Sequence, residues 1–183
     1  MTAAVLLCAG GSTRFAGAQH KLLTPFRGRP LVNWSLSSVE EADLDEVIVV
    51  VGGVDLSAVL GNVVVVDNSA WHSGQATSLR AGVEEARRRG HDAVVVGLGD
   101  QPLIPGSAWR SVADSMSPIA VATFNGHRSP PTRLADSVWE FLPQTGDVGA
   151  RELINARPDL VVEINCDGDP LDIDTEDDWM RWN

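Results

Sequence analysis

Two cations and a pair of glycines lie close together near the start of the chain, in the stretch LCAGGSTRFAGAQHKLL (residues 7–23). A short apolar run ends at Gly10 and Gly11, which have no side chains to keep a ligand away from the backbone N–H groups. Consecutive N–H groups in such a turn form a concave site for anions, and hydroxyl groups with Arg14 and Lys21 add further donors. The loop is therefore interpreted as a phosphate-binding loop, with a tight structural turn as the alternative.

Two common nucleotide-binding motifs do not describe this loop. A Walker loop needs Gly-Lys followed by Ser or Thr, whereas Lys21 follows His20 and precedes Leu22. A dinucleotide fingerprint needs G-x-G-x-x-G, which the GGSTRFAG segment does not supply. The loop therefore belongs to neither class.

A carboxylate follows another apolar run, in GLGDQPLIP (residues 97–105). Asp100 comes just after this predicted buried strand and before a proline-stiffened loop. Mg2+ commonly takes one or two protein carboxylates and completes its coordination with phosphates and water. Asp100 is thus the candidate metal ligand, for Mg2+ or for Mn2+ in its place, and the alternative is a helix cap near Pro105. The four histidines show no metal-ligand spacing, and no role is assigned to them.

The third polar stretch is DNSAWHSGQATS (residues 67–78), in which Asn68 follows a strand and Gly74 leads into a predicted helix. Ser78 lies in the first turn of that helix, and helix N-termini bind anions and polar ring edges. Trp71 could stack on a base, although packing over the core is the simpler interpretation.

Two late stretches add acidic residues. In GDVGAR (146–151), Asp147 is expected at the start of a helix, a usual capping position, with Arg151 nearby. In LDIDTEDDW (171–179), Asp172 and Asp174 are two residues apart and would point to one side of an extended chain. The alternative for this acidic run is a solvated helix start capped by Thr175.

The elements expected to position these residues alternate along the chain. Two predicted helices span residues 30–42 and 75–90, and between such stretches lie short β-branched runs typical of strands buried on both faces. These runs are residues 3–8, 46–51, 62–67, 93–98, 119–124 and 160–164. We predict an α/β fold with a mostly parallel sheet covered on both faces, in which ligands bind at the carboxyl ends of the strands.

Composition limits the classes of function. The 183 residues suit a single domain spanning 1–183, without an internal repeat or linker. The net charge of −11 argues against a broad surface for nucleic acid or an anionic membrane. Cys8 and Cys166 are too few for a disulfide framework, and Cys8 is expected to be a buried thiol. With no basic leader and no long apolar segment, a soluble cytoplasmic protein is expected.

Taken in order, these stretches resemble the MobA-like NTP transferase family. LCAGGSTR followed by Lys21 is similar to the signature loop of that family, which many NTP transferases share. GDQPLIP, NSAWHSGQATSLRAG, GDVGAR and DIDTEDDW are similar to the molybdopterin cytidylyltransferase branch, over nearly the whole chain. The interval from Arg14 to Lys21 is two residues longer than usual, and Pro130 stands near where a histidine is common. The resemblance implies a single-domain, three-layer α/β/α, Rossmann-like (GT-A-like) nucleotidyltransferase fold.

The resemblance also implies roles for individual residues. Arg14, Lys21 and Asp100 would be catalytic, with Asp100 holding the metal, and Asp147, Arg151, Asp172 and Asp174 would lie near the acceptor. The nucleotide would be bound by Leu7, Cys8, Ala9, Gly10, Gly11, Ser12, Arg14, Lys21, Asn68 and Ser78.

The implied reaction is Mg2+-dependent transfer of CMP from CTP to molybdopterin with release of pyrophosphate, which would serve a molybdoenzyme of the xanthine dehydrogenase type. Ala9, where guanine users carry glycine, favours CTP over GTP. One alternative is a transferase of the same fold with another acceptor, such as a sugar phosphate or a phospholactate-like acid. The other is a non-catalytic carrier of a nucleotide-bearing cofactor.

Overall fold

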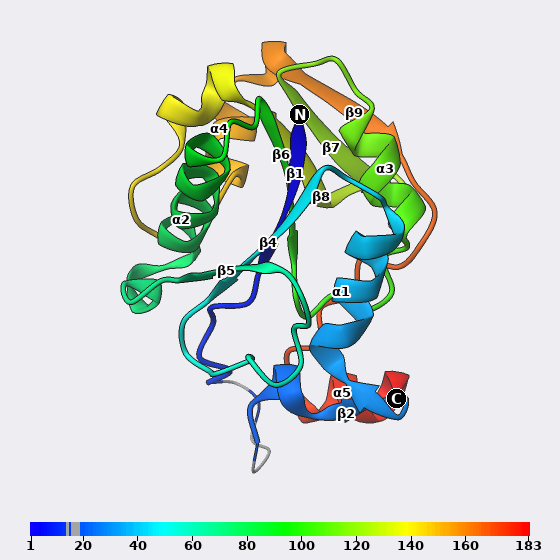
Figure 1. Cartoon of the computed structure of the whole chain (residues 1–183). Coiled ribbons are helices and arrows are strands. Elements are labelled where there is room, and N and C mark those ends of the chain that lie inside the picture. The colour runs from blue at the N-terminus through cyan, green and yellow to red at the C-terminus, as the bar shows by residue number, and fades with distance from the viewer. Residues whose placement is uncertain (14, 16–18) are drawn as a thin grey trace.

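The computed structural model describes residues 1–13, 15 and 19–183, and Arg14 lies outside these described residues. A seven-stranded sheet crosses the molecule in the order β5-β4-β1-β6-β8-β7-β9, as Figure 1 shows for most of its length. The strands are β1 (Thr2–Leu7), β4 (Glu46–Val51), β5 (Val64–Asp67), β6 (Ala93–Leu98), β7 (Ile119–Phe124), β8 (His127–Ala135) and β9 (Val161–Asn165). A separate two-stranded hairpin joins β2 (Pro25–Phe26) and β3 (Arg29–Pro30).

The predicted strands are confirmed, with ends that differ by one or two residues. β1 lies between β4 and β6 and pairs in parallel with both, and Ala3 to Leu6 are fully buried. This arrangement explains why these runs are continuously apolar, since both faces of the central strands are covered.

The sequence analysis missed the two strands of the short β2–β3 hairpin and one strand of the large sheet, β8, which pairs antiparallel with both β6 and β7. Its sequence HRSPPTRLA has no continuous β-branched run and contains two prolines, which normally argue against a strand. The pairing with β7 shifts between Val121 and Ala122, whose partners are Thr132 and Ser129. The two prolines fall in the skipped interval, where no ladder hydrogen bond requires their missing N–H groups.

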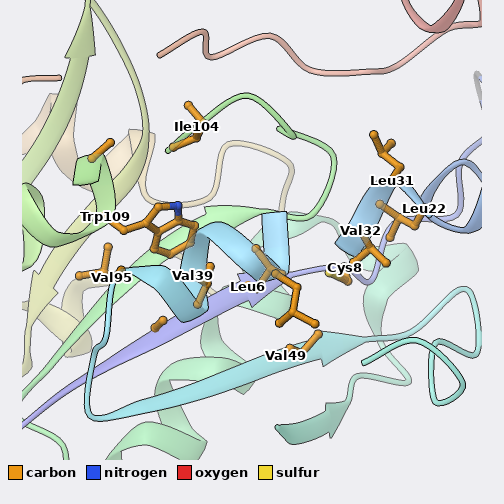
Figure 2. Close-up of a cluster of buried hydrophobic side chains, with 14 of the residues drawn as sticks. Leu6, Cys8, Leu22, Leu31, Val32, Val39, Val49, Val95, Ile104 and Trp109 are labelled. Carbon is orange, nitrogen blue, oxygen red and sulfur yellow. The ribbon is translucent and has the colours of Figure 1, made fainter. Parts of the chain in front are cut away.

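Helices cover both faces of the sheet, as predicted (Figure 1). α1 (Leu31–Glu41) and α3 (Gly106–Ala113) lie on one face, and α2 (Gln75–Arg88) and α4 (Arg151–Ala156) lie on the other. Figure 2 shows the core under α1 and α3, where Val39 and Trp109 meet Leu6, Val49 and Val95 of the strands. Among the described residues, no helix has the length and apolar character needed to cross a membrane.

The last helix, α5 (Glu176–Trp182), fixes the position of the acidic segment before it. Its predicted N-cap is confirmed, because the Thr175 hydroxyl accepts a hydrogen bond from the Asp178 N–H in a capping box. The Trp179 indole N–H donates to the Pro25 carbonyl at 3.1 Å, which anchors α5 on the β2–β3 hairpin. The C-terminal segment is thereby held beside the loop that contains Lys21.

The opposite, amino-terminal end of the sheet carries an ion-pair cluster around Glu46. Arg89 binds both carboxylate oxygens of Glu46, and His91 Nε2 lies 2.9 Å from Oε2. Hydrogen bonds from Arg89, and more weakly from His91, lower the pKa of Glu46 from 4.5 to about 2. A depressed carboxyl pKa stabilises the fold above pH 4.5, and this contribution is lost as the pH falls through 2.

Glu46→Gln is therefore expected to lower the free energy of unfolding at pH 7 by about 1 kcal/mol, a value reduced for solvent screening. The difference from the wild type should shrink as the pH is lowered below 4.5. Chemical denaturation at several pH values measures it. Glu163→Gln, which breaks the exposed pair with Arg128, is the matched control and should have little effect at any pH. A decrease in the free energy of unfolding of Glu46→Gln that is the same at every pH would contradict the electrostatic explanation.

Candidate functional site

A cavity of about 720 Å3 opens at the carboxyl ends of β1 and β6, where the sequence predicted the site. The structure brings together at its wall most of the residues singled out in the sequence. These are Leu7, Cys8, Ala9, Gly10, Gly11, Ser12, Lys21, Ser78, Asp100, Asp147, Asp172 and Asp174. Asn68 and Arg151 do not line the cavity, and Arg14 lies outside the described residues.

The glycine loop packs against a second glycine pair, Gly52 and Gly53, which follows β4. The Gly53 N–H donates to the Ala9 carbonyl at 3.1 Å, and a Cβ at Gly53 would lie 3.1 Å from the Gly11 Cα. Sequence reasoning missed Gly52 and Gly53, which follow the apolar strand β4 as Gly10 and Gly11 follow shortly after β1. That repeated pattern at a strand end was the available signal.

Trp71 packs against the glycine loop. A Cβ at Gly11 would lie 2.6 Å from the Trp71 ring, and a Cβ at Gly52 would lie 2.7 Å from it. Packing against Trp71 therefore favours glycine at position 11, which supports the structural-turn alternative there, and the phosphate-loop interpretation stays a prediction. The half-buried indole also forms part of the cavity wall.

Lys21 begins a short 3-10 turn at the end of the loop, with its side chain directed to two carboxylates. Lys21 Nζ donates to Asp100 Oδ2 at 2.6 Å and to Asp174 Oδ1 at 2.7 Å. Burial by itself would lower the pKa of this ammonium, but Asp100 and Asp174 more than offset it, and the pKa lies above its ordinary value. The Lys21 N–H also donates to Ser12 Oγ at 3.2 Å, which ties the turn to the glycine loop.

His20, to which the sequence assigned no role, holds the same loop. Its Nδ1 accepts from the Leu22 N–H, so Nε2 carries the proton and donates to the Gly10 carbonyl at 2.9 Å. Burial, aided by the charge of Lys21 and opposed by the Gly10 bond, lowers the pKa of His20. The imidazole is therefore neutral at pH 7 and holds the loop in place through these two hydrogen bonds.

The acidic side of the cavity combines two segments that are far apart in sequence. The Ile173 N–H donates to the Asp100 carbonyl at 3.0 Å, and the Ile173 side chain is fully buried. With Ile173 facing the core, Asp172 and Asp174 both line the cavity, which confirms the expected one-sided arrangement. Partial desolvation, with the charges of Asp100 and Asp174, raises the pKa of Asp172 to about 6 although its side chain remains open to water.

Gln101, which the sequence analysis did not single out, anchors this acidic segment. Its side-chain amide donates to the Pro170 carbonyl at 3.1 Å, and the residue is buried. It therefore helps to set the position of Asp172.

Asn68 acts on the cavity indirectly. Its side chain is buried, and Nδ2 donates to Thr77 Oγ1 at 2.9 Å and to Ser78 Oγ at 3.0 Å. These bonds fix the first turn of α2, whose Ser78 lines the cavity.

The helix expected to start at Asp147 begins instead at Arg151, whose side chain is exposed. Asp147 belongs to the loop before it, which is fastened to α2 because the Ala76 N–H donates to the Gly146 carbonyl at 2.9 Å. Asp147 consequently reaches the cavity, whereas Arg151 does not line it.

Gly74, at the start of α2, allows this loop to approach. Its φ is +109°, and a Cβ there would lie 2.4 Å from the Gly146 backbone. Gly74→Ala should lower the free energy of unfolding by about 2–4 kcal/mol, measured by chemical denaturation. Gly90→Ala is the matched control, because φ is +82° there and no atom lies within 4 Å of the added Cβ. It should cost only about 1–2 kcal/mol. Equal losses in both variants would show that the close contact with Gly146 is unimportant.

The donor set suits a hard divalent cation. The grouped carboxylates of Asp100 and Asp174 already share one cation, the ammonium of Lys21, and carboxylate oxygens are the ligands that Mg2+ and Mn2+ prefer. In the described part of the chain, no group of three or more His, Cys, Asp or Glu side chains is arranged to hold a metal by itself. Two carboxylates are enough for a cation that completes its coordination with phosphates and water.

Comparison with known proteins agrees with this geometry. The family described as MobA-like NTP transferase domain matches residues 4–161. The chain belongs to this family. It is therefore a nucleotidyltransferase by family, and the family resemblance drawn from its motifs is confirmed.

Two curated relatives extend over almost the whole chain. Nicotine blue oxidoreductase from Paenarthrobacter nicotinovorans is 30% identical, covering 97% of this chain and 94% of that protein. The purine catabolism protein PucB from Bacillus subtilis (strain 168) is 29% identical, covering 96% and 92%.

Solved structures share the fold. Rv0371c from Mycobacterium tuberculosis H37Rv, in complex with manganese, has a TM-score of 0.83 and 29% identity, covering 99% of this chain and 97% of that one. A nucleotidyl transferase from Methanothermobacter has the same TM-score at 22% identity, covering 99% and 95%, and its likeness concerns the fold alone. The single-domain α/β nucleotidyltransferase fold is thus confirmed.

Proposed function

We propose that this chain is a cytoplasmic, Mg2+-dependent cytidylyltransferase that transfers CMP from CTP to molybdopterin and releases pyrophosphate. The observation that carries the proposal is the meeting of Lys21 with Asp100 and Asp174 beside the glycine loop in one cavity. A cation and two carboxylates beside such a loop suit an anionic nucleotide that arrives with a divalent metal. The resemblance of GDQPLIP, GDVGAR and DIDTEDDW to the molybdopterin cytidylyltransferase branch supports the choice of reaction.

The residues of this chain would align two anions and neutralise their charge. Gly10, Gly11 and Ser12 line the cavity, and their N–H groups would bind the triphosphate together with Lys21. Arg14 is proposed as a second phosphate-binding cation on its sequence position. Asp100, assisted by Asp174, would hold the metal. When bound, Mg2+ would neutralise phosphate charge as a Lewis acid, and the manganese complex of Rv0371c supports a divalent ion.

The acceptor is assigned to the remaining wall of the cavity, formed by Asp147, Asp172 and the start of α2. Arg151 is close in sequence and is proposed to contact the part of the acceptor that projects from the cavity. The terminal phosphate of the acceptor would attack the α-phosphorus of CTP, so a side-chain nucleophile is unnecessary and alignment supplies most of the catalysis. Asn68 would act through Ser78 on the nucleoside.

A panel assay tests this function. The protein is incubated with Mg2+, each NTP and a set of acceptors that includes molybdopterin, a sugar phosphate and phospholactate, and pyrophosphate is measured. We expect pyrophosphate to be released only when CTP and molybdopterin are combined. Transfer of the product to a xanthine-dehydrogenase-type apoenzyme would identify the client. Release with a different acceptor would replace molybdopterin. Binding without any pyrophosphate would favour a cofactor carrier, and substrate reduction without pyrophosphate would favour an oxidoreductase, as one relative is named.

A further inference from the structure

Lys21 is the only lysine in the chain, whose other 13 cationic side chains are all arginines. Its side chain is 13% exposed, and its ammonium lies between Asp100 Oδ2 and Asp174 Oδ1 at 2.6 and 2.7 Å. These carboxylates belong to the same group that is assigned above to the divalent cation. A side chain of the protein itself thus contacts the oxygens to which the metal would bind.

We propose that Lys21 is an exchangeable internal counter-ion, which occupies the carboxylates of the metal site in the free protein and leaves them for the triphosphate when metal and nucleotide bind together. This inference rests on the proposed function and adds to it how the binding of metal and the binding of nucleotide depend on each other. Because Lys21 and the metal compete for Asp100 and Asp174, metal alone binds weakly. Because the nucleotide offers the ammonium a new anionic partner, metal and nucleotide each strengthen the binding of the other.

The charges at the site support an exchange rather than a permanent ion pair. Asp100, Asp172 and Asp174 with Lys21 carry a formal charge of −2, from three carboxylates and one ammonium. Among these four described side chains, negative charge therefore exceeds positive charge while Lys21 is in place. A divalent cation would neutralise that excess, and the ammonium, now repelled, would need another anion because it lies in a largely buried place.

The position of Lys21 also makes a short movement sufficient. Its backbone N–H is bonded to Ser12 Oγ, so the residue starts from the glycine loop that would bind the phosphates. We expect rotation about the bonds of its own side chain to turn the ammonium from the carboxylates to the loop. Lysine suits this exchange because its ammonium is a compact charge on a flexible stem, whereas arginine would grip a carboxylate with two parallel bonds.

A single lysine permits a direct observation. Protein labelled with 15N in the lysine side chain gives one ammonium signal in NMR, which reports on Lys21 alone. The whole chain is titrated with Mg2+, with a CTP analogue that has a methylene group between the α- and β-phosphorus, and with both. Only a small change is expected with metal alone, and a large change in the 15N shift is expected with both. An unchanged signal when metal and analogue are both bound would overturn the proposal.

Mn2+ binding, followed by electron paramagnetic resonance, gives the second measurement. Without nucleotide, Lys21→Met should bind Mn2+ about tenfold more tightly than the wild type does. Addition of the analogue should then increase the Mn2+ affinity of Lys21→Met by a smaller factor than it increases that of the wild type. Lys21→Arg keeps the charge and should bind Mn2+ no more tightly than the wild type. Equal or weaker Mn2+ binding by Lys21→Met, or tighter binding in both variants, would overturn the exchange.

The same measurements separate this inference from the proposed function. If wild-type protein binds no Mn2+ even with the analogue, the metal-dependent reaction fails and the exchange fails with it. If Mn2+ and analogue bind together and the Lys21 signal stays unchanged, the exchange alone is wrong and the metal-dependent function stands.

Discussion

Replacement of Asp100 by Asn is expected to lower kcat on the order of a thousandfold while the protein stays folded. Asp100 follows β6 and lines the cavity, and its carboxylate is bound to Lys21. The variant keeps the size of the side chain and the Asp100 carbonyl that accepts from Ile173, so the acidic segment should remain in place. It removes a negative charge and one of the oxygen ligands proposed for the metal. Pyrophosphate release at saturating Mg2+ measures the loss.

Asp114→Asn provides the matched control for this change. Asp114 is exposed at the C-terminal cap of α3 and does not line the cavity, so its activity should equal that of the wild type. Thermal unfolding of both variants should show that neither has lost the fold. Near-normal turnover in Asp100→Asn would show that Asp100 is not needed for the reaction, whether or not the variant still binds the metal.

The sequence predicts most of this fold because the central strands are buried on both faces, and strands buried in this way consist of continuous apolar, β-branched residues. β8 escapes prediction because its two prolines fit only in a bulge, which depends on the register with β7. Asp100 and the glycine loop were found from their positions at the ends of apolar runs. That rule depends on parallel strands ending at one edge of the sheet, and the structure has this edge.

Pairwise contacts between distant segments could not be predicted. Lys21 and Asp174 are 153 residues apart, and nothing local in either segment indicates that they share an ion pair with Asp100. The roles of Asn68 and His20 are similar, since each is a hydrogen-bond clamp whose partners are defined only by the folded loop. Sequence patterns thus identify most of the residues that line the cavity, while tertiary contacts decide which residues hold them there.

Wild-type protein is expected to use CTP with a kcat/KM roughly a hundredfold above that for GTP. Ala9 follows β1 and lines the cavity, and it is only 4% exposed. Its position is fixed, because its carbonyl accepts from the Gly53 N–H and the residue packs in the core cluster under α2. A methyl group in such a rigid wall cannot move aside for a larger base. A bicyclic purine would therefore lose more binding than a pyrimidine, by about 1–3 kcal/mol.

Ala9→Gly should reduce this preference at least several-fold, mainly by raising kcat/KM for GTP. The loss of one methyl and the added backbone freedom of glycine also lower stability, so a control with the same chemical change is needed. Ala4→Gly meets this need, because Ala4 is fully buried in β1, the strand that Ala9 follows, and does not line the cavity. It should lower stability and leave the ratio of CTP to GTP use unchanged. Equal use of both nucleotides by the wild type, or a preference for GTP, would exclude the cytidylyltransferase assignment. A wild-type CTP preference that survives in Ala9→Gly would instead assign base selection to another part of the wall, because the cavity would then reject GTP without the Ala9 methyl.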